Sequence, residues 1–375
     1  MKYYIIAGEA SGDLHASNLM KSLKKLDTEA AFRFWGGDLM QAQGGTIVKH
    51  YKSLAFMGLV EVLKNIRTIF SNLSLCKSDV LAFKPDALIL VDYPGFNMRI
   101  AEFAKENNIP VHYYISPKIW AWKESRIHKI KRFVDHMYVI FPFEKPFYEE
   151  KHRYPVYFVG NPLIDAIHQT NTMSSDAFRV ENNLSSAPII ALLPGSRKQE
   201  ITEMLGVMLS MVSRYPKYQF VIAGAPTHDF SFYQQFMNAE NVSFVSNQTY
   251  DLLANASAAL VTSGTATLET ALFKVPEIVC YKTNWLTYQV GKRLVDLKFV
   301  SLVNLILDKE VVKELIQDDL SPENLALEMD KILDESHRKQ LDNDYEELID
   351  VLGGTGASDK TAAIIYKNAQ VTAMI

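Results

Sequence analysis

The chain has 375 residues, of which 48% are hydrophobic, and a formal net charge of −4. This length and apolar content predict a globular protein of about two to three domains, each with a large buried core. The weak negative charge excludes a global positive field for nucleic acid, and two cysteines are too few for a disulfide framework.

Short apolar or β-branched runs alternate with segments of helical periodicity along the chain. The runs expected to form strands cover residues 3–7, 87–91, 111–115, 137–140, 189–193, 219–223, 242–244 and 258–261. Residues 14–26 and 201–212 are among the helical segments. This alternation predicts an α/β fold, with parallel sheets covered by helices on both faces and ligands at the carboxyl ends of the strands.

A polar stretch at residues 169–175 separates two series of this alternation. We interpret it as the boundary between an N-terminal α/β domain, residues 1–165, and a C-terminal one, residues 166–352. The sequence G-G-T-G then breaks the chain before a final helix. That last segment, residues 353–375, can pack back on the N-terminal domain or on a partner subunit.

The first strand is followed by the sequence A-G-E-A-S-G-D at residues 7–13. Its glycines permit a tight turn and the close approach of a ligand, although a simple turn capped by Ser11 or Asp13 is an equal alternative. The spacing is not G-x-G-x-x-G, and no acidic residue follows the second strand at residues 32–35. Both features argue against a nicotinamide-dependent oxidoreductase.

Hydrophobic residues recur at helical spacing between residues 54 and 69. The positions are Leu54, Met57, Val60, Leu63, Ile66 and Ile69. Packing of this face into the core is the favoured interpretation, and contact with acyl chains or a bilayer surface is the alternative. Since no apolar run approaches the about 20 residues of a spanning helix, we expect surface association with a membrane at most.

Asp92 stands at the end of a wholly apolar strand and precedes Tyr93 and Pro94. A carboxylate in this position is partly desolvated, so its pKa is expected to rise toward the range of a general base. A loop aspartate that caps the turn before Pro94 is the competing interpretation.

The segment of residues 113–132 joins aromatic residues to a cluster of cations. The cations are Lys118, Lys123, Arg126, Lys129, Lys131 and Arg132. Such a cluster suits an anionic substrate or anionic lipid head groups, and a solvated helix face is an equal alternative. Nucleic-acid binding is disfavoured because the patch is single and the rest of the chain is acidic.

Two glycine turns in the C-terminal half each follow a strand and precede a helix. They are L-L-P-G-S-R at residues 192–197 and T-S-G-T-A-T-L-E-T-A-L at residues 262–272. Unpaired amides at a helix start favour an anion, so the two turns predict a diphosphate site, with Arg197 suited to phosphate oxygens. Glu269 would repel phosphates but can accept from a ribose diol. An ordinary helix N-cap, with Arg197 at the surface, is the alternative.

Six motifs, taken in chain order, resemble those of the lipid-A-disaccharide synthase family. They are A-G-E-A-S-G-D, Y-Y-I-S-P-K-I-W-A-W, F-P-F-E-K-P-F-Y (residues 141–148), L-P-G-S-R, T-S-G-T-A-T-L-E and S-L-V-N (residues 301–304). The resemblance implies a GT-B glycosyltransferase, in which two Rossmann-like domains with parallel sheets face each other across a cleft. The C-terminal domain would bind the UDP-sugar, and the N-terminal domain would face the acceptor and the membrane.

The implied reaction joins UDP-2,3-diacylglucosamine to 2,3-diacylglucosamine 1-phosphate and yields a β-1,6-linked disaccharide 1-phosphate and UDP. An α-linked donor that gives a β-linkage requires inversion, and hence one base and stabilisation of the departing UDP. Asp92 is the candidate base, with Asp13 and His15 as further candidates. We expect no cofactor and no metal, and we interpret the D-N-D run at residues 342–344 as a solvated helix face.

The resemblance also assigns residues to substrate binding. The candidates for the donor are Gly195, Ser196, Arg197, Ser263, Gly264, Thr265, Ala266, Glu269, Asn304 and Glu314, the last two without a firm role. The candidates for the acceptor, its phosphate or its lipid are Ser11, Gly12, Met57, Val60, Trp120, Lys123 and Arg126. The sequence D-Y-P-G-F at residues 92–96 departs from the D-A-P-D-F common in the family, so a second carboxylate is not expected there.

The expected partners are the two acylated sugars and the inner-membrane surface, on which the protein would lie peripherally from the cytoplasm. A homodimer, in which C-terminal segments could be exchanged, is also compatible with the family. The alternatives are another GT-B enzyme for UDP-N-acetylglucosamine, either a lipid-linked transferase or a 2-epimerase, and a non-catalytic UDP-sugar-binding protein.

Overall fold

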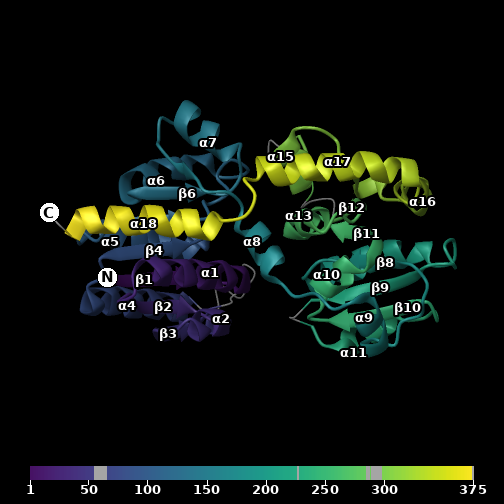
Figure 1. The fold of residues 1–375 in the computed structure, drawn as a ribbon, viewed down its shortest axis with the longest axis horizontal. Coiled ribbons are helices and arrows are strands. Elements are labelled where there is room, and N and C mark those ends of the chain that lie inside the picture. Colours follow the sequence, from purple (N-terminus) through teal and green to yellow (C-terminus); the bar gives the residue numbers. More distant parts are fainter. Residues whose placement is uncertain (55–65, 226–227, 284–287, 289–297, 374–375) are drawn as a thin grey trace. The chain divides into compact units, whose positions relative to one another are not determined.

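The computed structural model describes all residues except 55–65, 226–227, 284–287, 289–297 and 374–375. The chain forms two compact units (Figure 1). Unit 1 comprises Met1–His168 and Leu352–Ile375, and unit 2 comprises Gln169–Val351. The C-terminal segment therefore belongs to the same unit as the N-terminal half of the chain.

Unit 1 is built on a sheet of seven parallel strands in the order β3-β2-β1-β4-β5-β6-β7. The strands are β1 (Lys2–Ala7), β2 (Ala31–Gly36), β3 (Thr46–His50), β4 (Ala87–Val91), β5 (Val111–Tyr114), β6 (His136–Val139) and β7 (Tyr157–Phe158). Every residue of β4 and β5 is buried. This burial agrees with a parallel sheet that is covered on both faces.

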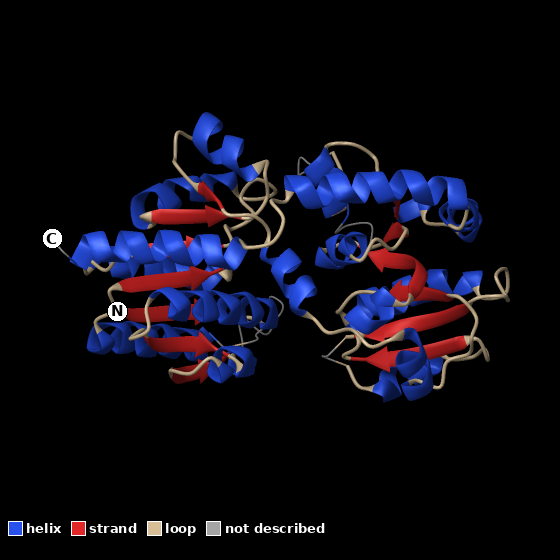
Figure 2. Cartoon of the chain, in the orientation of Figure 1, coloured by secondary structure: helices blue, strands red, loops and turns tan. Residues whose placement is uncertain are grey.

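The helices of unit 1 lie on both faces of this sheet (Figure 2). They are α1 (Ala10–Leu26), α2 (Asp38–Ala42), α4 (Ile66–Phe83), α5 (Pro94–Glu106), α6 (Ile127–Phe133), α7 (Glu144–Pro146), α8 (Pro162–Gln169) and α18 (Ala357–Ala373), with short turns η1 (Tyr51–Ser53), η2 (Glu124–Arg126) and η3 (Phe147–Lys151). Helices α1 and α18 pack side by side. Helices α4 and α5 contribute Val80, Ile100 and Ala104 to the core on the face formed by Tyr4 and Leu90.

The last helix is fastened to unit 1 at its N-terminus. The Asp165 carboxylate accepts hydrogen bonds from the backbone amides of Gly356 (2.6 Å) and Ser358 (3.0 Å). Two amides that have no partner within α18 are thus satisfied by a residue of α8. After the G-G-T-G break at residues 353–356, α18 thus packs beside α1, the first helix of the chain.

Unit 2 repeats the same topology with six parallel strands in the order β10-β9-β8-β11-β12-β13. They are β8 (Ile189–Leu193), β9 (Gln219–Gly224), β10 (Val242–Ser246), β11 (Ala256–Thr262), β12 (Glu277–Tyr281) and β13 (Lys313–Ile316). The helices are α9 (Ser175–Glu181), α10 (Lys198–Met208), α11 (Phe230–Tyr233), α12 (Thr249–Ala254), α13 (Thr265–Leu272), α15 (Leu302–Leu307), α16 (Pro322–Ile332) and α17 (Glu335–Val351), with turns η4 (Leu209–Met211), η5 (Gln234–Phe236) and η6 (Gln317–Asp319).

Both sheets therefore have the strand order of a Rossmann-like fold, which confirms the predicted α/β class. All nine expected strands are present, including the second strand at residues 32–35, whereas β3, β7, β12 and β13 are not predicted from the sequence. Three of these four lie at sheet edges, where partial exposure weakens the apolar pattern, and β12 begins with the buried carboxyl of Glu277. Within the described ranges, no helix is long and apolar enough to cross a membrane.

Candidate functional site

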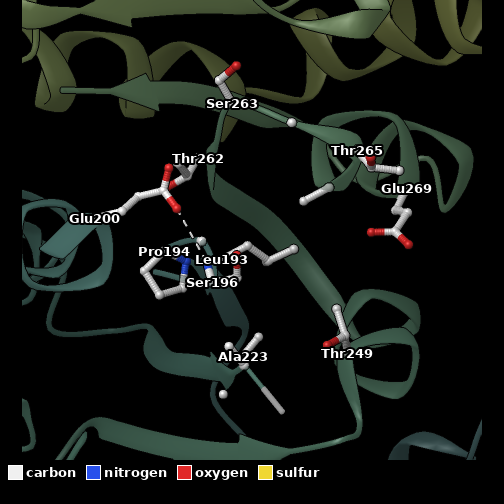
Figure 3. Close-up of a pocket in the computed structure, with 15 residues that line it drawn as sticks. Leu193, Pro194, Ser196, Glu200, Ala223, Thr249, Thr262, Ser263, Thr265 and Glu269 are labelled. Atoms are coloured by element: carbon white, nitrogen blue, oxygen red, sulfur yellow. Dashed lines mark hydrogen bonds between the residues drawn. The ribbon is translucent and has the colours of Figure 1, made fainter. Parts of the chain in front are cut away.

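A pocket of about 330 Å³ opens in unit 2 at the carboxyl ends of β8, β9 and β11 (Figure 3). Seven residues that the sequence assigned to the donor line it together, namely Gly195, Ser196, Ser263, Gly264, Thr265, Ala266 and Glu269. Its other lining residues are Leu193, Pro194, Glu200, Ala223, Gly224, Ala225, Thr249 and Thr262. The two glycine turns thus face one cavity, as parallel strands require of loops at the same sheet edge.

Helix α13 begins at this pocket with its first amides uncapped. Its N-cap residue, Gly264, has a φ of +148° and offers no side chain to the helix start. Thr265 and Ala266 follow in the first turn and line the pocket. Because the positive end of the helix dipole lies here, the geometry suits an anionic group.

Glu200, in the first turn of α10, also lines the pocket, and the sequence did not indicate it as a site residue. Gly195 has a φ of +97°, and a Cβ at this position would overlap the Glu200 side chain. Glu200 accepts a hydrogen bond of 3.3 Å from the Ser196 amide, drawn in Figure 3. The signal was its place in the first turn of α10, three residues after the N-cap residue Arg197, where acidic residues commonly reach back to loop amides.

Arg197 itself is exposed and is not among the residues that line the pocket. Its charge nevertheless acts on Tyr281, at the end of β12. Burial raises the pKa of the Tyr281 hydroxyl, the Glu200 charge raises it further, and the Arg197 charge lowers it. Arg197 directly follows Ser196, which lines the pocket, and its contact with a phosphate stays a prediction.

Glu269 projects from α13 and receives a hydrogen bond from the Tyr250 hydroxyl at 3.0 Å. Burial raises the pKa of the Glu269 carboxyl, and the bond from Tyr250 opposes this shift. Tyr250, in α12, is a second residue that the sequence did not indicate, because its partner is 19 positions away.

Asn304 and Glu314, two further donor candidates, do not line the pocket. Asn304 Oδ1 accepts hydrogen bonds from the amides of Val311 (2.8 Å) and Val312 (2.9 Å). Asn304 Nδ2 donates to Val312 O at 2.8 Å and to Glu314 Oε1 at 3.0 Å. Glu314 accepts from the amides of Val300 (2.9 Å) and Ser301 (2.8 Å). Since Val300 O accepts from Ser263 Oγ at 3.2 Å, this pair supports the pocket wall indirectly.

In unit 1, Asp92 ends β4 in a strained backbone conformation. Asp92 and Tyr93 have φ values of +45° and +47°, which are uncommon for residues other than glycine. The Asp92 carbonyl accepts hydrogen bonds from Asn97 Nδ2 and Tyr113 Oη, both at 2.7 Å. A Cβ on Gly8 would overlap the Tyr93 ring, so the first glycine loop packs against this turn.

The pKa of the Asp92 carboxyl is raised toward neutrality, as a general base requires. Burial raises its pKa to about 6, the Lys118 charge lowers it, and the Glu9 charge raises it. A carboxylate with a pKa nearer to neutrality is a stronger proton acceptor and still largely ionised at pH 7.

The two other base candidates are placed differently. Asp13 is buried, and its carboxylate accepts from the amides of Gly37 (2.7 Å), Leu39 (3.1 Å) and Met40 (3.2 Å) at the start of α2. Burial lowers the pKa of His15 to about 4, although the Asp165 charge opposes this shift. Asp13 is thus committed to the fold, which leaves Asp92 as the favoured candidate.

The described acceptor candidates of unit 1 lie in two separate stretches, at the start of α1 and between residues 120 and 126. Ser11 is exposed at the start of α1, and Gly12 packs against Ala7. Trp120 donates from Nε1 to Glu144 at 3.1 Å. Met57 and Val60, with most of the predicted apolar helix, lie outside the described residues.

A small basic surface surrounds Trp122, whose side chain is 45% exposed. Lys123 Nζ lies 4.1 Å and the Arg126 guanidinium 5.7 Å from the centroid of a Trp122 ring. We call these three residues the Trp122 surface. An exposed aromatic ring flanked by cations is typical of contact with an anionic partner.

In the described part of the chain, no group of three or more histidine, cysteine, aspartate or glutamate residues could hold a metal ion. The D-N-D run lies in α17, where Asp344 accepts a hydrogen bond from Lys309 at 2.7 Å.

Comparison with known proteins identifies relatives of the whole chain. The family model described as "Lipid-A-disaccharide synthetase" matches residues 3–367. A protein named lipid-A-disaccharide synthase from Geobacter metallireducens is 39% identical over 370 residues, 97% of this chain and 96% of that protein. One of the same name from Coxiella burnetii is 38% identical over 341 residues, 90% of each.

Solved structures share the fold at low identity. UDP-GlcNAc 2-epimerase from Neisseria meningitidis, bound to UDP-GlcNAc, has a TM-score of 0.66 at 14% identity and covers 99% of this chain and 100% of its own. The glycotransferase of kitacinnamycin has a TM-score of 0.68 at 12% identity, with coverage of 98% and 99%.

Proposed function

This chain belongs to the lipid-A-disaccharide synthase family, and from that premise we propose how its residues carry out the reaction. The chain is a glycosyltransferase of lipid A biosynthesis. Its proposed donor is UDP-2,3-diacylglucosamine, and its proposed acceptor is 2,3-diacylglucosamine 1-phosphate. The products are the β-1,6-linked disaccharide 1-phosphate and UDP.

The donor's diphosphate is placed at the uncapped start of α13 in the pocket of unit 2. The amides of Thr265 and Ala266 and the positive helix end face the phosphates there, and they stabilise the charge that develops on departing UDP. The side chain of Glu200 bonds to the neighbouring loop amide and must leave that position if the diphosphate uses it. Arg197, next to the lining residue Ser196, would add a cation to the same leaving group.

Glu269 is proposed to accept hydrogen bonds from the two ribose hydroxyls of UDP. Its side chain is partly buried and lines the pocket, and among the described residues one hydrogen bond, from Tyr250, is made to its carboxylate. Further acceptor capacity is therefore left for a diol.

Asp92 is proposed to be the base. It would take the proton of the acceptor's 6-hydroxyl as that oxygen forms a bond to C1 of the donor sugar and the bond from C1 to the UDP oxygen breaks. The single displacement inverts C1. The observation that carries this assignment is the position of Asp92 at the carboxyl end of β4, and its raised pKa supports it.

The Trp122 surface is proposed to rest on anionic lipid at the cytoplasmic side of the inner membrane, where acylated substrates reside. Its exposed ring and two cations support this placement.

One assay tests the proposed reaction. The protein is incubated with both acylated sugars, and disaccharide and UDP are measured. We expect equimolar formation of both products, and a decrease of about 10²–10⁴-fold in kcat for Asp92→Asn with unchanged UDP binding. A folded protein without disaccharide product would contradict the reaction, and a near-normal rate for Asp92→Asn would exclude Asp92 as the base.

A further inference from the structure

One buried carboxylate holds the loop after β5, residues 116–122, at two points, and a hydrogen bond of 3.2 Å between Ser116 Oγ and Tyr148 Oη adds a third contact. Glu144 is 1% exposed. Its Oε1 accepts hydrogen bonds from Ser116 Oγ at 2.8 Å and Trp120 Nε1 at 3.1 Å. Both donors belong to the loop, one near its start and one near its end.

The other oxygen of the same carboxylate binds the chain just after β6. Glu144 Oε2 accepts from the amides of Ile140 (3.0 Å) and Phe141 (2.9 Å). An ionised carboxylate has acceptors only, so it can satisfy four donors at once. A glutamine at this position has one carbonyl oxygen and one NH₂ group. In either orientation its NH₂ group faces one of the two pairs of hydrogen-bond donors and cannot accept from them.

The loop begins from a strained residue, which the surrounding bonds must hold. Ile115 has a φ of +65°, a rare value for a β-branched side chain, and its amide bonds to Tyr138 O at 3.1 Å. Ser116, the first residue held by Glu144, follows directly. Release of the Glu144 side chain would therefore allow the loop to leave this conformation.

The loop starts next to Asp92, whose amide donates a hydrogen bond to Tyr114 O at 3.0 Å. It carries Lys118, a cation whose charge acts on the Asp92 carboxyl. The other charge that acts on it is that of Glu9, from the loop after β1. The neutral hydroxyl of Tyr113, in β5, donates a hydrogen bond to the Asp92 carbonyl. Lys118 favours the ionised carboxylate and Glu9 disfavours it. The position of the loop therefore affects how readily Asp92 holds a proton.

We propose that Glu144 is a positioning residue, which ties residues 116–122 so that Lys118 stands beside Asp92. This inference rests on the proposed role of Asp92 as the base. Glu144 would not contact substrate; it would act through the loop.

The test is the pH dependence of kcat/KM, whose acid limb reports the base of the free enzyme. Loss of the Lys118 charge beside Asp92 raises the pKa of that carboxyl, so the acid limb moves to higher pH. We expect shifts of about 0.5–1 pH unit for both Glu144→Gln and Lys118→Ala. The double variant should show no additional shift, because both changes remove one effect.

A matched control is Glu149→Gln. Glu149 also accepts a backbone amide, that of Val156 at 3.2 Å, and lies in the neighbouring turn, but it does not bond to the loop. Its acid limb should stay in place. If Glu144→Gln fails to fold, Trp120→Phe removes one loop donor and leaves the Glu144 carboxylate intact, and we expect a smaller shift in the same direction.

Unshifted acid limbs in Glu144→Gln or, where that variant does not fold, in Trp120→Phe, beside a shift in Lys118→Ala, would overturn the inference. Additive shifts in the double variant would overturn it as well. If Asp92 is not the base, the outcome is different. Asp92→Asn then retains activity, and the acid limb of the wild type belongs to another group.

Discussion

At the scale of single residues, Asp92 combines a strained backbone with a carboxyl whose pKa is raised to about 6 by burial. Both features cost stability, and both are usual at sites that act on substrates. The hydrogen bonds to its carbonyl from Asn97 and Tyr113 hold the turn in place. The side chain is left for chemistry, whereas that of Asp13 is used up by three backbone amides.

The raised pKa of Asp92 predicts a pH-dependent gain in stability for Asp92→Asn. An acid with a higher pKa in the folded state favours folding below its unfolded pKa, and this contribution is lost as pH rises through about 6. At pH 7.5 the variant should therefore be more stable than the wild type by about 1–2 kcal/mol. Thermal unfolding at pH 7.5 and pH 4 would measure this, and an equal difference at both pH values would contradict it.

Glu269→Ala is predicted to weaken UDP binding about 10–100-fold, because hydrogen bonds to a buried carboxylate contribute about 1.5–3 kcal/mol. Titration calorimetry with UDP would measure the affinity. Tyr250→Phe is the control: it removes the bond from Tyr250 but leaves the carboxylate, and should change affinity less. An unchanged affinity in Glu269→Ala would remove the ribose assignment.

Among the helices, α18 and α13 differ in whether a side chain caps their first amides. Helix α18 begins with amides that the Asp165 carboxylate caps, and it is structural. Helix α13 begins at Gly264 without a side-chain cap and faces the pocket. The amides at the start of α18 thus contribute to stability, whereas those at the start of α13 are proposed to bind a ligand.

Asp165→Ala is predicted to destabilise the fold by about 1–2 kcal/mol, since it removes the cap of α18. Lys25→Ala is a suitable control, because it also acts at α18 but breaks only the exposed ion pair with Asp359, which should change stability little. Urea unfolding of both variants would compare them. Equal, small losses would show that the cap contributes little.

At the scale of the whole molecule, one topology occurs twice along the chain, and each unit presents its proposed functional loops at the carboxyl ends of its strands. Unit 2 holds the anion pocket, and unit 1 holds Asp92 and the Trp122 surface. The acylated substrates proposed for the enzyme fit a protein that works at a lipid surface.

Binding to vesicles tests that placement. We expect the wild type to sediment with vesicles that contain anionic lipid and to be released at high salt. Loss of Lys123 and Arg126 together should weaken binding by about tenfold or more, at about 1 kcal/mol for each cation. Lys129→Ala is the control, because Lys129 is exposed but pairs with Glu102 at 3.7 Å. Equal effects of the two changes would argue against the Trp122 surface.

The amino-acid sequence predicts the α/β class, the loops that carry the proposed site and the family. Alternation of apolar runs and helical periods is local, and so are glycine turns such as those at Gly195 and Gly264, which adopt positive φ values as the turns require. Asp92 is a candidate for the same reason, because an acidic residue directly after an apolar strand is a local signal.

Which polar side chains are engaged in holding the fold is visible only in the folded chain. Glu144 meets Ser116 from 28 positions away, Asp13 caps α2 from 24 to 27 positions away, and Asp165 reaches Gly356 across 191. A hydrogen bond between distant residues leaves no periodic or compositional trace in the sequence. Chain folding alone therefore separates the carboxylates that hold the fold from the one that is proposed to act as a base.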